Sequence, residues 1–137
     1  MSSVEFDDSR RSMVIVKVPP RELTPAEFDA TLQTISTYNA RARTGFVFDV
    51  RDSPPLNADR RRMIAERIDG DAKLHSRASP CAIVVSSAVF VGVARVLAWL
   101  TQTKRQTRTF SSIDEALDWL RVVLERDREV EGDGYAA

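Results

Sequence analysis

The stretch Gly45–Leu56 has the sequence GFVFDVRDSPPL, in which a short apolar segment is followed directly by polar residues. A segment this short, rich in aromatic and β-branched residues, is typical of a buried strand rather than of a helix. The polar side chains that end it are those of Asp49, Arg51, Asp52 and Ser53. Pro54–Pro55 then prevents a regular continuation. Because open α/β sheets bind ligands beyond the carboxyl ends of their strands, this stretch predicts both a fold class and a working edge.

Upstream of this stretch, the sequence predicts a hairpin and a capped helix. Two β-prone segments, Val4–Phe6 and Met13–Val18, are separated by the polar residues 7–12, which is typical of a β-hairpin. Thr24 and Glu27 then stand at the spacing of a capping box, with a proline between them in the first helical turn. A helix therefore begins there, and its inward face is expected to carry Phe28, Leu32, Ile35 and either Tyr38 or Asn39.

Downstream, the same alternation of helix and strand continues. Asn57 is a suitable N-cap for a helix that is expected to end near Gly70. The residues expected on its inward face are Met63, Ile64 and Ile68. Cys81–Val85 has the composition of a further buried strand. Val89–Leu100 is expected to form a helix that is apolar on nearly all sides, and such a helix is either the most buried one or a surface for a partner.

The last unit is a short strand followed by a second capped helix. Arg108–Phe110 is the strand, and Ser112 with Glu115 has the spacing of a capping box. One face of the helix collects the apolar residues Ile113, Ala116, Leu117, Leu120 and Leu124. From about Arg126 the chain is charged and then contains glycine, so a flexible tail is expected. We therefore expect one domain over residues 1–125 and a tail over residues 126–137.

The order of these elements, ββαβαβαβα, predicts an α/β fold. We expect a single mixed, mostly parallel sheet with an N-terminal hairpin, right-handed crossovers and helices covering the sheet. A length of 137 residues, of which 43% are hydrophobic, suits one domain with one sizeable core. The pattern alone leaves the order of the strands within the sheet open.

Composition excludes several classes of function. Twenty basic and twenty acidic side chains cancel, so no net field favours nucleic acid or an anionic membrane. The longest apolar segment is shorter than the roughly 20 residues that span a bilayer, and no membrane span is expected. The N-terminus lacks the pattern of a secretory signal. Cys81 is the single cysteine and lies in an apolar run, so we expect no disulfide and a cytoplasmic protein.

Three segments carry a resemblance to a known superfamily. They are FVFDVRD at 46–52, CAIVVSS at 81–87 with the apolar helix after it, and TFSSIDEALDWL at 109–120. Together with the order of elements, they resemble the STAS-like superfamily, the fold of anti-sigma-factor antagonists and of the regulatory domain of sulfate transporters. The last segment is similar to a bacterial branch that is also compared with lipid-binding CRAL-TRIO domains. The resemblance implies a regulatory protein that docks a partner, with no chemistry and no cofactor of its own.

The sequence departs from the phosphorylation motif of that superfamily. In the members that act as phosphorylation switches, a strand ends in Asp, and a partner kinase phosphorylates a Ser or Thr at the start of the next helix. Asp49 and Asp52 match the acidic part of this pattern. Ser53, however, precedes Pro54–Pro55, and Asn57 occupies the expected helix start. Ser53 is therefore interpreted as an ordinary loop serine at the end of a strand, with a phosphosite as the alternative.

The leading hypothesis is a non-enzymatic module that binds a partner protein at the carboxyl ends of its parallel strands. The residues predicted for this surface are Asp49, Asp52, Ser53, Asn57, Ser86 and Ser87. Asp49 is expected to be neutralised by a neighbouring arginine or a backbone donor. A basic patch made by Arg60, Arg61 and Arg67 could hold phosphate or an acidic partner, or it is a solvated helix face paired with nearby acids.

Two alternatives remain open. In the first, an apolar ligand or lipid lies against Val89–Leu100, although the same helix could instead form a homodimer. In the second, Asp49 accepts a phosphoryl group with Mg²⁺, as in receiver domains. Its companions would be Asp7–Asp8, Ser86 or Ser87, and Lys104. A receiver needs a helix directly after its acidic pair, whereas Ser9–Ser12 leads into another strand.

Other candidate residues are given structural roles. His75 has no companions at metal-ligand spacing, so a position on the surface or at a helix end is expected. Trp99 and Trp119 stand at helical spacing among leucines and are assigned to core packing. We expect no metal site and no catalytic residues.

Overall fold

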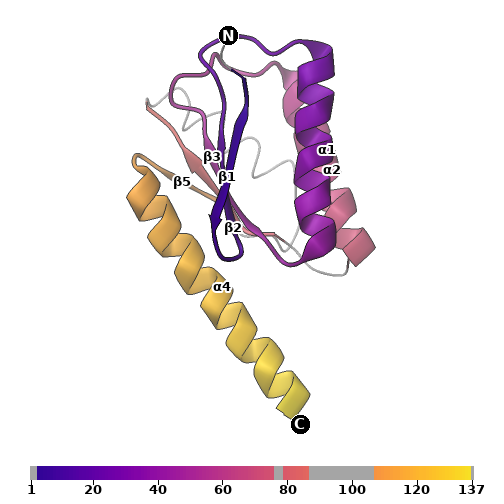
Figure 1. Cartoon of the computed structure of the whole chain (residues 1–137), viewed down its shortest axis with the longest axis vertical. Coiled ribbons are helices and arrows are strands. Elements are labelled where there is room, and N and C mark those ends of the chain that lie inside the picture. The colour runs from indigo at the N-terminus through magenta and orange to yellow at the C-terminus, as the bar shows by residue number, and fades with distance from the viewer. Residues whose placement is uncertain (1–2, 76–78, 87–106, 137) are drawn as a thin grey trace.

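A five-stranded sheet, with its strands arranged in the order of the sequence, forms the centre of the molecule (Figure 1). The computed structural model describes residues 3–75, 79–86 and 107–136. Its strands are β1 (Glu5–Arg10), β2 (Met13–Lys17), β3 (Gly45–Asp49), β4 (Cys81–Val84) and β5 (Thr107–Phe110). β1 pairs with β2 antiparallel, and β2 to β5 run parallel to one another. The mixed, mostly parallel sheet with an N-terminal hairpin is confirmed.

The hairpin turn is tighter than the sequence indicated. β1 continues to Arg10, so the turn consists of residues 11 and 12 instead of residues 7–12. Ser12 occupies the left-handed region, with a φ of 63°, and this conformation reverses the chain within a short turn. The polar residues of β1 were misread as a loop because an edge strand can expose most of its side chains to water.

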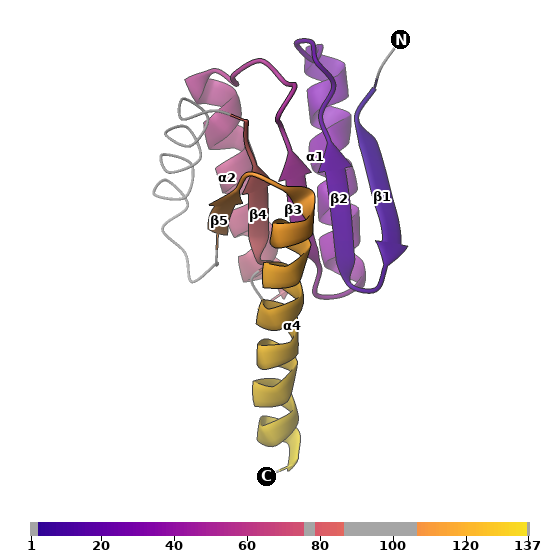
Figure 2. The same ribbon diagram turned by 90° about the vertical axis from the view of Figure 1, so that its left-hand side faces the viewer.

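The helices are α1 (Pro25–Arg41), α2 (Ala58–His75) and α4 (Ile113–Ala136), labelled as in Figure 1. α1 and α2 lie side by side on one face of the sheet, and α4 covers part of the other face (Figure 2). Crossovers between parallel strands are right-handed. When each new strand is added on the same side of the previous one, right-handed crossovers place their helices on the same face of the sheet. α4 follows the last strand and packs on the remaining face. Val89–Leu100 and Trp99 lie outside the residues that the structure describes.

Side chains alternate between the two faces along each strand, and each face has its own hydrophobic core. The core beneath α1 and α2 includes Val14, Val16, Ile35, Phe46, Ile68 and Cys81. The core beneath α4 includes Met13, Val47, Ala82, Val84, Leu117, Leu120 and Leu124. β3 and β4 are buried on both faces, which explains their nearly continuous apolar sequence.

Two predicted helix starts are confirmed in atomic detail. The Thr24 hydroxyl accepts a hydrogen bond from the Glu27 amide, and the Glu27 carboxylate accepts one from the Thr24 amide, at 3.1 and 2.9 Å. This is the expected capping box at the start of α1. At the start of α2, the side-chain oxygen of Asn57 accepts a hydrogen bond of 2.8 Å from the Arg60 amide. Local sequence therefore determines where both helices begin.

Two details of α2 were predicted wrongly. The helix continues past Gly70 to His75, because a single exposed glycine weakens a helix without ending it. Met63 is 43% exposed, although it was expected on the inward face. The buried stripe of α2 contains Ala65 and Ile68. Successive residues are rotated by about 100° around the helix axis. This rotation places Met63 on the opposite side of α2 from Ala65 and Ile68.

α4 begins at the predicted cap, where the Glu115 amide donates a hydrogen bond of 3.2 Å to the Ser112 hydroxyl. Its buried stripe is Ala116, Leu117, Leu120, Val123 and Leu124. The helix continues to Ala136, through residues that were expected to form a tail, and its last turns project beyond the sheet (Figure 2). Within the described residues, every helix is too short or too polar to cross a bilayer.

Candidate functional site

Parallel strands β2 to β5 end at the same edge of the sheet, and the loops that follow β2, β3 and β4 meet there. Strand-like hydrogen bonds continue one residue past each strand. The amides of Val18, Val50 and Val85 donate to the carbonyl oxygens of Asp49, Val84 and Phe110, at 3.1, 3.2 and 2.9 Å. We call the surface formed by residues 17–24, 49–57 and 85–86 the strand-end surface. The first residue after each of these strands is therefore held in register by the backbone before any side chain contributes.

An ion pair between Asp49 and Arg51 lies at the centre of this surface. The Asp49 side chain is 4% exposed, and its two carboxylate oxygens accept hydrogen bonds of 2.9 Å from Nε and a terminal nitrogen of Arg51. These bonds from Arg51 hold the pKa of Asp49 below its ordinary value, although burial acts in the opposite direction. The same contact raises the pKa of Arg51. Asp49 is therefore neutralised by a neighbouring arginine, as expected from the sequence.

Through its backbone, Arg51 also joins two loops. The backbone carbonyl of Arg51 accepts a hydrogen bond of 3.0 Å from the hydroxyl of Ser86, which follows β4. Lys17, at the end of β2, lies beside Asp49 in the strand register and favours its charged form. The end of β3 is thus bonded to the residue after β4, and the charge of Lys17 at the end of β2 acts on the same carboxylate.

Ser53 is 6% exposed, and its hydroxyl donates a hydrogen bond of 2.9 Å to the carbonyl oxygen of Pro54. Its amide donates to the carbonyl oxygen of Val50, at 3.2 Å, which closes a turn directly after β3. Asp52 and Asn57 on either side of it are exposed. A partner or a kinase would therefore reach Asp52 without rearrangement, but it would reach the Ser53 hydroxyl only after the turn opened.

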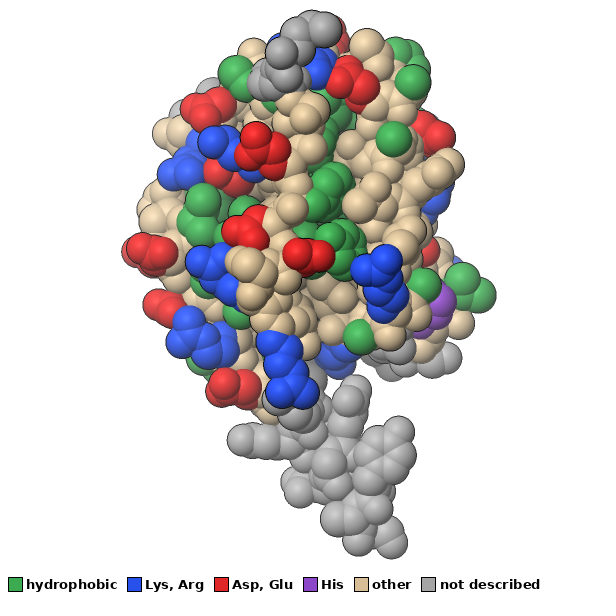
Figure 3. Space-filling model, viewed as in Figure 1, with side chains coloured by type: hydrophobic (Ala, Val, Ile, Leu, Met, Phe, Trp, Pro, Cys, Tyr) green, Lys and Arg blue, Asp and Glu red, His purple; other side chains and the backbone are tan. Residues whose placement is uncertain are grey.

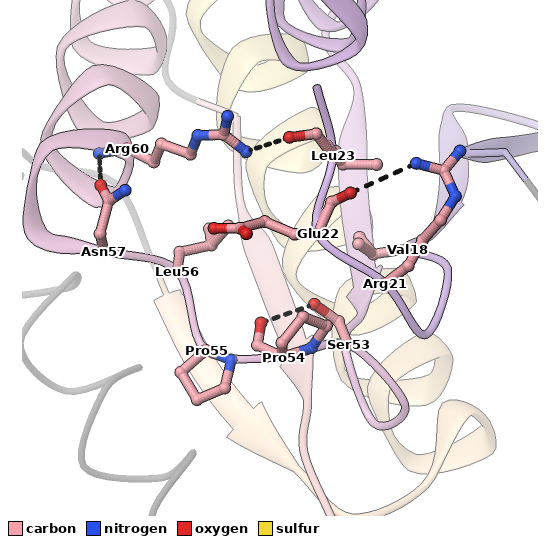
Figure 4. A pocket seen from close by; sticks show the side chains of 10 residues that line it. All are labelled: Val18, Arg21, Glu22, Leu23, Ser53, Pro54, Pro55, Leu56, Asn57 and Arg60. Carbon is pink, nitrogen blue, oxygen red and sulfur yellow. Dashed lines mark hydrogen bonds between the residues drawn. The ribbon is translucent and has the colours of Figure 1, made fainter. Parts of the chain in front are cut away.

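A shallow pocket of about 270 Å³, including solvent at its mouth, lies between the loop after β2 and the loop before α2 (Figure 4). It is lined by Val18, Arg21, Glu22, Leu23, Ser53, Pro54, Pro55, Leu56, Asn57 and Arg60. Sequence reasoning missed the contribution of residues 21–23. That contribution depends on the position of β2 beside β3, which no local pattern reveals.

Two arginines of the predicted basic patch hold loops in place. Arg60 donates a hydrogen bond of 2.8 Å to the carbonyl oxygen of Leu23, and its guanidinium lies 4.9 Å from the ring centre of Phe28. Arg61 donates a hydrogen bond to the carbonyl oxygen of Leu56. Arg67 is half-buried further along α2. The guanidinium groups of Arg60 and Arg61 therefore fasten the loops on both sides of the pocket to α2.

The acidic residues of the receiver hypothesis do not come together. β1 runs antiparallel to β2, and its pairing sets Glu5 beside Lys17 at the strand ends, with Asp7 further along the sheet. The carboxylate of Asp8 accepts a hydrogen bond of 3.0 Å from the hydroxyl of Tyr38. Among the residues that the structure describes, no three His, Cys, Asp or Glu side chains form a group that could hold a metal ion. Lys104 and Ser87 lie outside those residues.

A buried polar cluster at the opposite edge of the sheet was not foreseen. Asn39 and Ser79 are both buried, and the Ser79 hydroxyl donates a hydrogen bond of 2.5 Å to the side-chain oxygen of Asn39. The carboxylate of Asp71 accepts from the Ser36 hydroxyl and the Asn39 amide group, at 2.9 and 3.2 Å. The cluster joins α1, α2 and the start of β4. The position of Asn39 on the inward face of the helix was the sequence signal for its burial. Its hydrogen-bond partners could not be predicted because they are distant in the sequence.

The remaining sequence-predicted residues occupy structural positions. His75 ends α2, and Cys81 is buried in β4. Trp119 packs on Phe110, with ring centres 5.6 Å apart, at the margin of the core beneath α4. The assignment of Trp119 to core packing is confirmed.

No protein-family model and no curated protein matches this chain. Solved structures do match it. An uncharacterised protein of the DUF3478 family from Shewanella loihica PV-4, with a SpoIIAA-like fold, aligns with a TM-score of 0.61 at 17% identity, over 86% of this chain and 92% of that one. The chain has a STAS-like fold. A serine-to-glutamate variant of RsbS from Moorella thermoacetica also aligns with a TM-score of 0.61, at 15% identity, over 90% of this chain and 99% of that one. The STAS-like fold expected from the sequence is thereby confirmed.

Proposed function

We propose that this chain is a cytoplasmic, non-enzymatic regulatory module that binds a partner protein through its strand-end surface. The observation that carries the proposal is the linkage of Asp49, Arg51 and Ser86 across the loops after β3 and β4. A surface whose loops are already ordered loses less conformational entropy when a partner binds. Exposed polar groups, among them Lys17 and Asp52, stand on this ordered base.

The mixture of charges on the strand-end surface supports recognition of a protein. Lys17 and the half-exposed Arg51 lie among the acidic side chains of Glu22 and Asp52. Interspersed charges of both signs discriminate between partners more than they raise affinity. The pocket of about 270 Å³ is shallow and includes open solvent, whereas small-molecule sites are typically enclosed cavities of roughly 300–1,000 Å³.

The likeness in fold to RsbS and to a SpoIIAA-like protein adds an argument by analogy for a regulatory role. The altered motif around Ser53 and the burial of its hydroxyl favour a docking role that does not depend on phosphorylation of that serine.

The test compares capture of partners by tagged wild type and by a variant that carries both Lys17→Glu and Asp52→Lys. These substitutions keep the net charge and change exposed positions of the strand-end surface. A variant with Asp118→Lys and Arg121→Glu is the matched control, because it makes the same charge swap on the exposed side of α4. Native cytosol supplies candidate partners, which mass spectrometry identifies.

Each candidate is then purified, and its dissociation constant is measured by calorimetry. We expect the variant at Lys17 and Asp52 to bind a true partner about tenfold or more weakly, whereas the α4 control binds like wild type. Equal affinities for all three proteins would show that the partner uses another surface. Intact mass of the recovered bait reports in parallel whether Ser53 carries a phosphate.

A further inference from the structure

β1 is an edge strand with unusual surroundings. Within the described part of the chain it has a strand neighbour, β2, on one side only. The outer side of an edge strand presents backbone N–H and C=O groups that another extended chain can pair with. Its two faces differ in chemistry, and this difference specifies what kind of chain could pair there.

The face of β1 toward α1 is partly apolar. Phe6 pairs with the buried Val16 and stacks on Tyr38 of α1, with ring centres 6.2 Å apart. Val4, Phe6 and Tyr38 are only partly buried where they pack on the core beneath α1 and α2. Figure 3 shows a stripe of hydrophobic side chains on this side of the molecule, in the region between β1 and α1, with acidic side chains next to it. A chain added to β1 would extend this apolar surface.

The other face of β1 is acidic. The pairing places Glu5 beside Lys17 and Asp7 beside Ile15, on the side of the sheet that carries α4. α4 lies over β3, β4 and β5 and leaves this part of the sheet uncovered in the described structure (Figure 2). Glu5 is exposed, and the side chain of Asp7 is 51% exposed while it forms an ion pair of 3.5 Å with Arg10.

We propose that the outer edge of β1 binds an extended segment of another protein as an added β-strand, in which hydrophobic residues alternate with Lys or Arg. Side chains of a strand point alternately to the two faces of a sheet. The hydrophobic ones would therefore contact Phe6 and Tyr38, while the basic ones would lie beside Glu5 and Asp7. This surface differs from the strand-end surface, so the proposal does not depend on the function proposed above.

Charge argues against a second copy of this chain as the occupant. When two identical strands pair antiparallel about a two-fold axis perpendicular to the sheet, a residue lies opposite itself. In the registers centred on residues 5 to 8 of β1, this brings acidic side chains opposite one another: Glu5 or Asp7 or Asp8 against itself, or Glu5 against Asp7. Like charges directly opposite one another destabilise a strand pair, whereas opposite charges stabilise it by about 0.2–1 kcal/mol. Charged side chains on an edge strand can also serve only to prevent it from pairing with other chains. The experiment below distinguishes that role from binding of a peptide.

The probe is a fluorescein-labelled peptide of alternating valine and lysine, and its binding to the full chain is followed by fluorescence anisotropy at low salt. We expect saturable binding to wild type, about tenfold or more weakened by Glu5→Lys with Asp7→Lys, because two favourable cross-strand pairs become repulsive. The control is Asp118→Lys with Glu125→Lys, which changes the net charge equally at exposed positions on α4. This control is expected to bind nearly as well as wild type.

A second arm uses wild-type protein only. The same peptide with alternate backbone nitrogens methylated keeps its charge and side chains but loses the N–H groups that pair with a strand edge. We expect this peptide to bind about tenfold or more weakly, and the unmodified peptide to shift and protect the amides of residues 5–10 in NMR spectra.

Several results would overturn the proposal. They are the absence of saturable binding up to about 1 mM peptide, equal binding of the methylated peptide, and an equal loss of affinity in the α4 control. Self-association of the wild type that Glu5→Lys with Asp7→Lys abolishes would also overturn it, because the occupant would then be a second copy.

Discussion

Arg51 donates two hydrogen bonds of 2.9 Å to the carboxylate of Asp49, which precedes it by two residues at the end of β3. Asp49 is 4% exposed, while the side chain of Arg51 is 38% exposed. The pair therefore satisfies a buried carboxylate with a cation that remains partly hydrated. Such an arrangement avoids much of the desolvation cost of a fully buried pair.

The first prediction concerns this pair. Asp49→Asn should lower the free energy of unfolding by about 1–2 kcal/mol at pH 7, because charge-assisted hydrogen bonds are lost at a buried position while Arg51 can still reach water. Urea denaturation followed by circular dichroism measures the change. Arg51→Lys, which keeps the charge but not the two-pronged contact, should show a smaller loss. If Asp49→Asn is as stable as wild type, the pair makes no net contribution.

The second prediction concerns acid sensitivity at the start of α1. Hydrogen bonds from Arg21, followed by that from the Thr24 amide, lower the pKa of Glu27 to about 2 from an ordinary value of 4.5. A depressed carboxylate pKa stabilises the fold above the unfolded-state value, and this contribution is lost as the pH falls through the folded-state value. Thermal melts should therefore show Glu27→Gln less stable than wild type near pH 6. The difference should shrink between about pH 4.5 and pH 2. A difference in melting temperature that stays constant over this pH range would contradict the prediction.

The third prediction compares two glycines. A Cβ at Gly45 would lie 3.2 Å from methyl groups of the buried Leu120 and Leu124, whereas a Cβ at Gly70 would meet nothing within 4 Å. Gly45→Ala should cost about 1–3 kcal/mol through overpacking beneath α4. Gly70→Ala should stabilise the protein by up to about 1 kcal/mol, because alanine is the better helix former. Chemical denaturation of both variants tests the packing of α4 on β3. Equal changes in the free energy of unfolding for the two variants would contradict the prediction.

The fourth prediction concerns Ser53. Its hydroxyl is buried and donates only a local hydrogen bond, so Ser53→Ala should change the free energy of unfolding by about 1 kcal/mol or less. Ser53→Asp places a charge in the same buried position and should cost about 2 kcal/mol or more. Denaturation curves of the two variants provide the comparison. If Ser53→Asp is as stable as Ser53→Ala, the turn opens easily, and the phosphosite hypothesis regains support.

The fifth prediction concerns the end of α4, which Figure 2 shows projecting past the sheet. We propose that residues 126–137 behave as a tail that is separable from the domain at 1–125. Amide hydrogen exchange should be much faster after Arg126 than in the buried stripe around Leu120. Truncation after Arg126 should leave the melting temperature nearly unchanged. Slow exchange to Ala136 would instead indicate that this part of the helix is held by a contact with a partner or another copy.

Local signals predicted most of the secondary structure. The capping residues Thr24, Glu27, Asn57 and Ser112 identified three helix starts because a cap acts within one turn of chain. The errors arose where a local pattern had two physical interpretations. The charged residues of β1 are equally compatible with a loop and with an edge strand, and Gly70 can either end a helix or lie exposed within it.

The candidate site was predicted in part. The sequence indicated that the carboxyl end of β3 would be polar and that Asp49 would be neutralised, and Arg51 is close enough in sequence to be the obvious partner. It did not indicate that Ser53 would be buried or that residues 21–23 would line the same pocket. Both depend on contacts between loops that are distant along the chain.

By itself, the sequence determined the kind and order of the elements that the structure describes, the alternation of apolar faces and the positions of the caps, because these follow from interactions between residues a few positions apart. The tertiary structure decided the order of the strands, the burial of Asn39 and Ser79, and the side of the sheet that each helix covers. It also decided that β1 would be an edge with one partly apolar and one acidic face. These features come from long-range packing, in which the free energy of burying two apolar faces selects one arrangement among several that the local pattern allows.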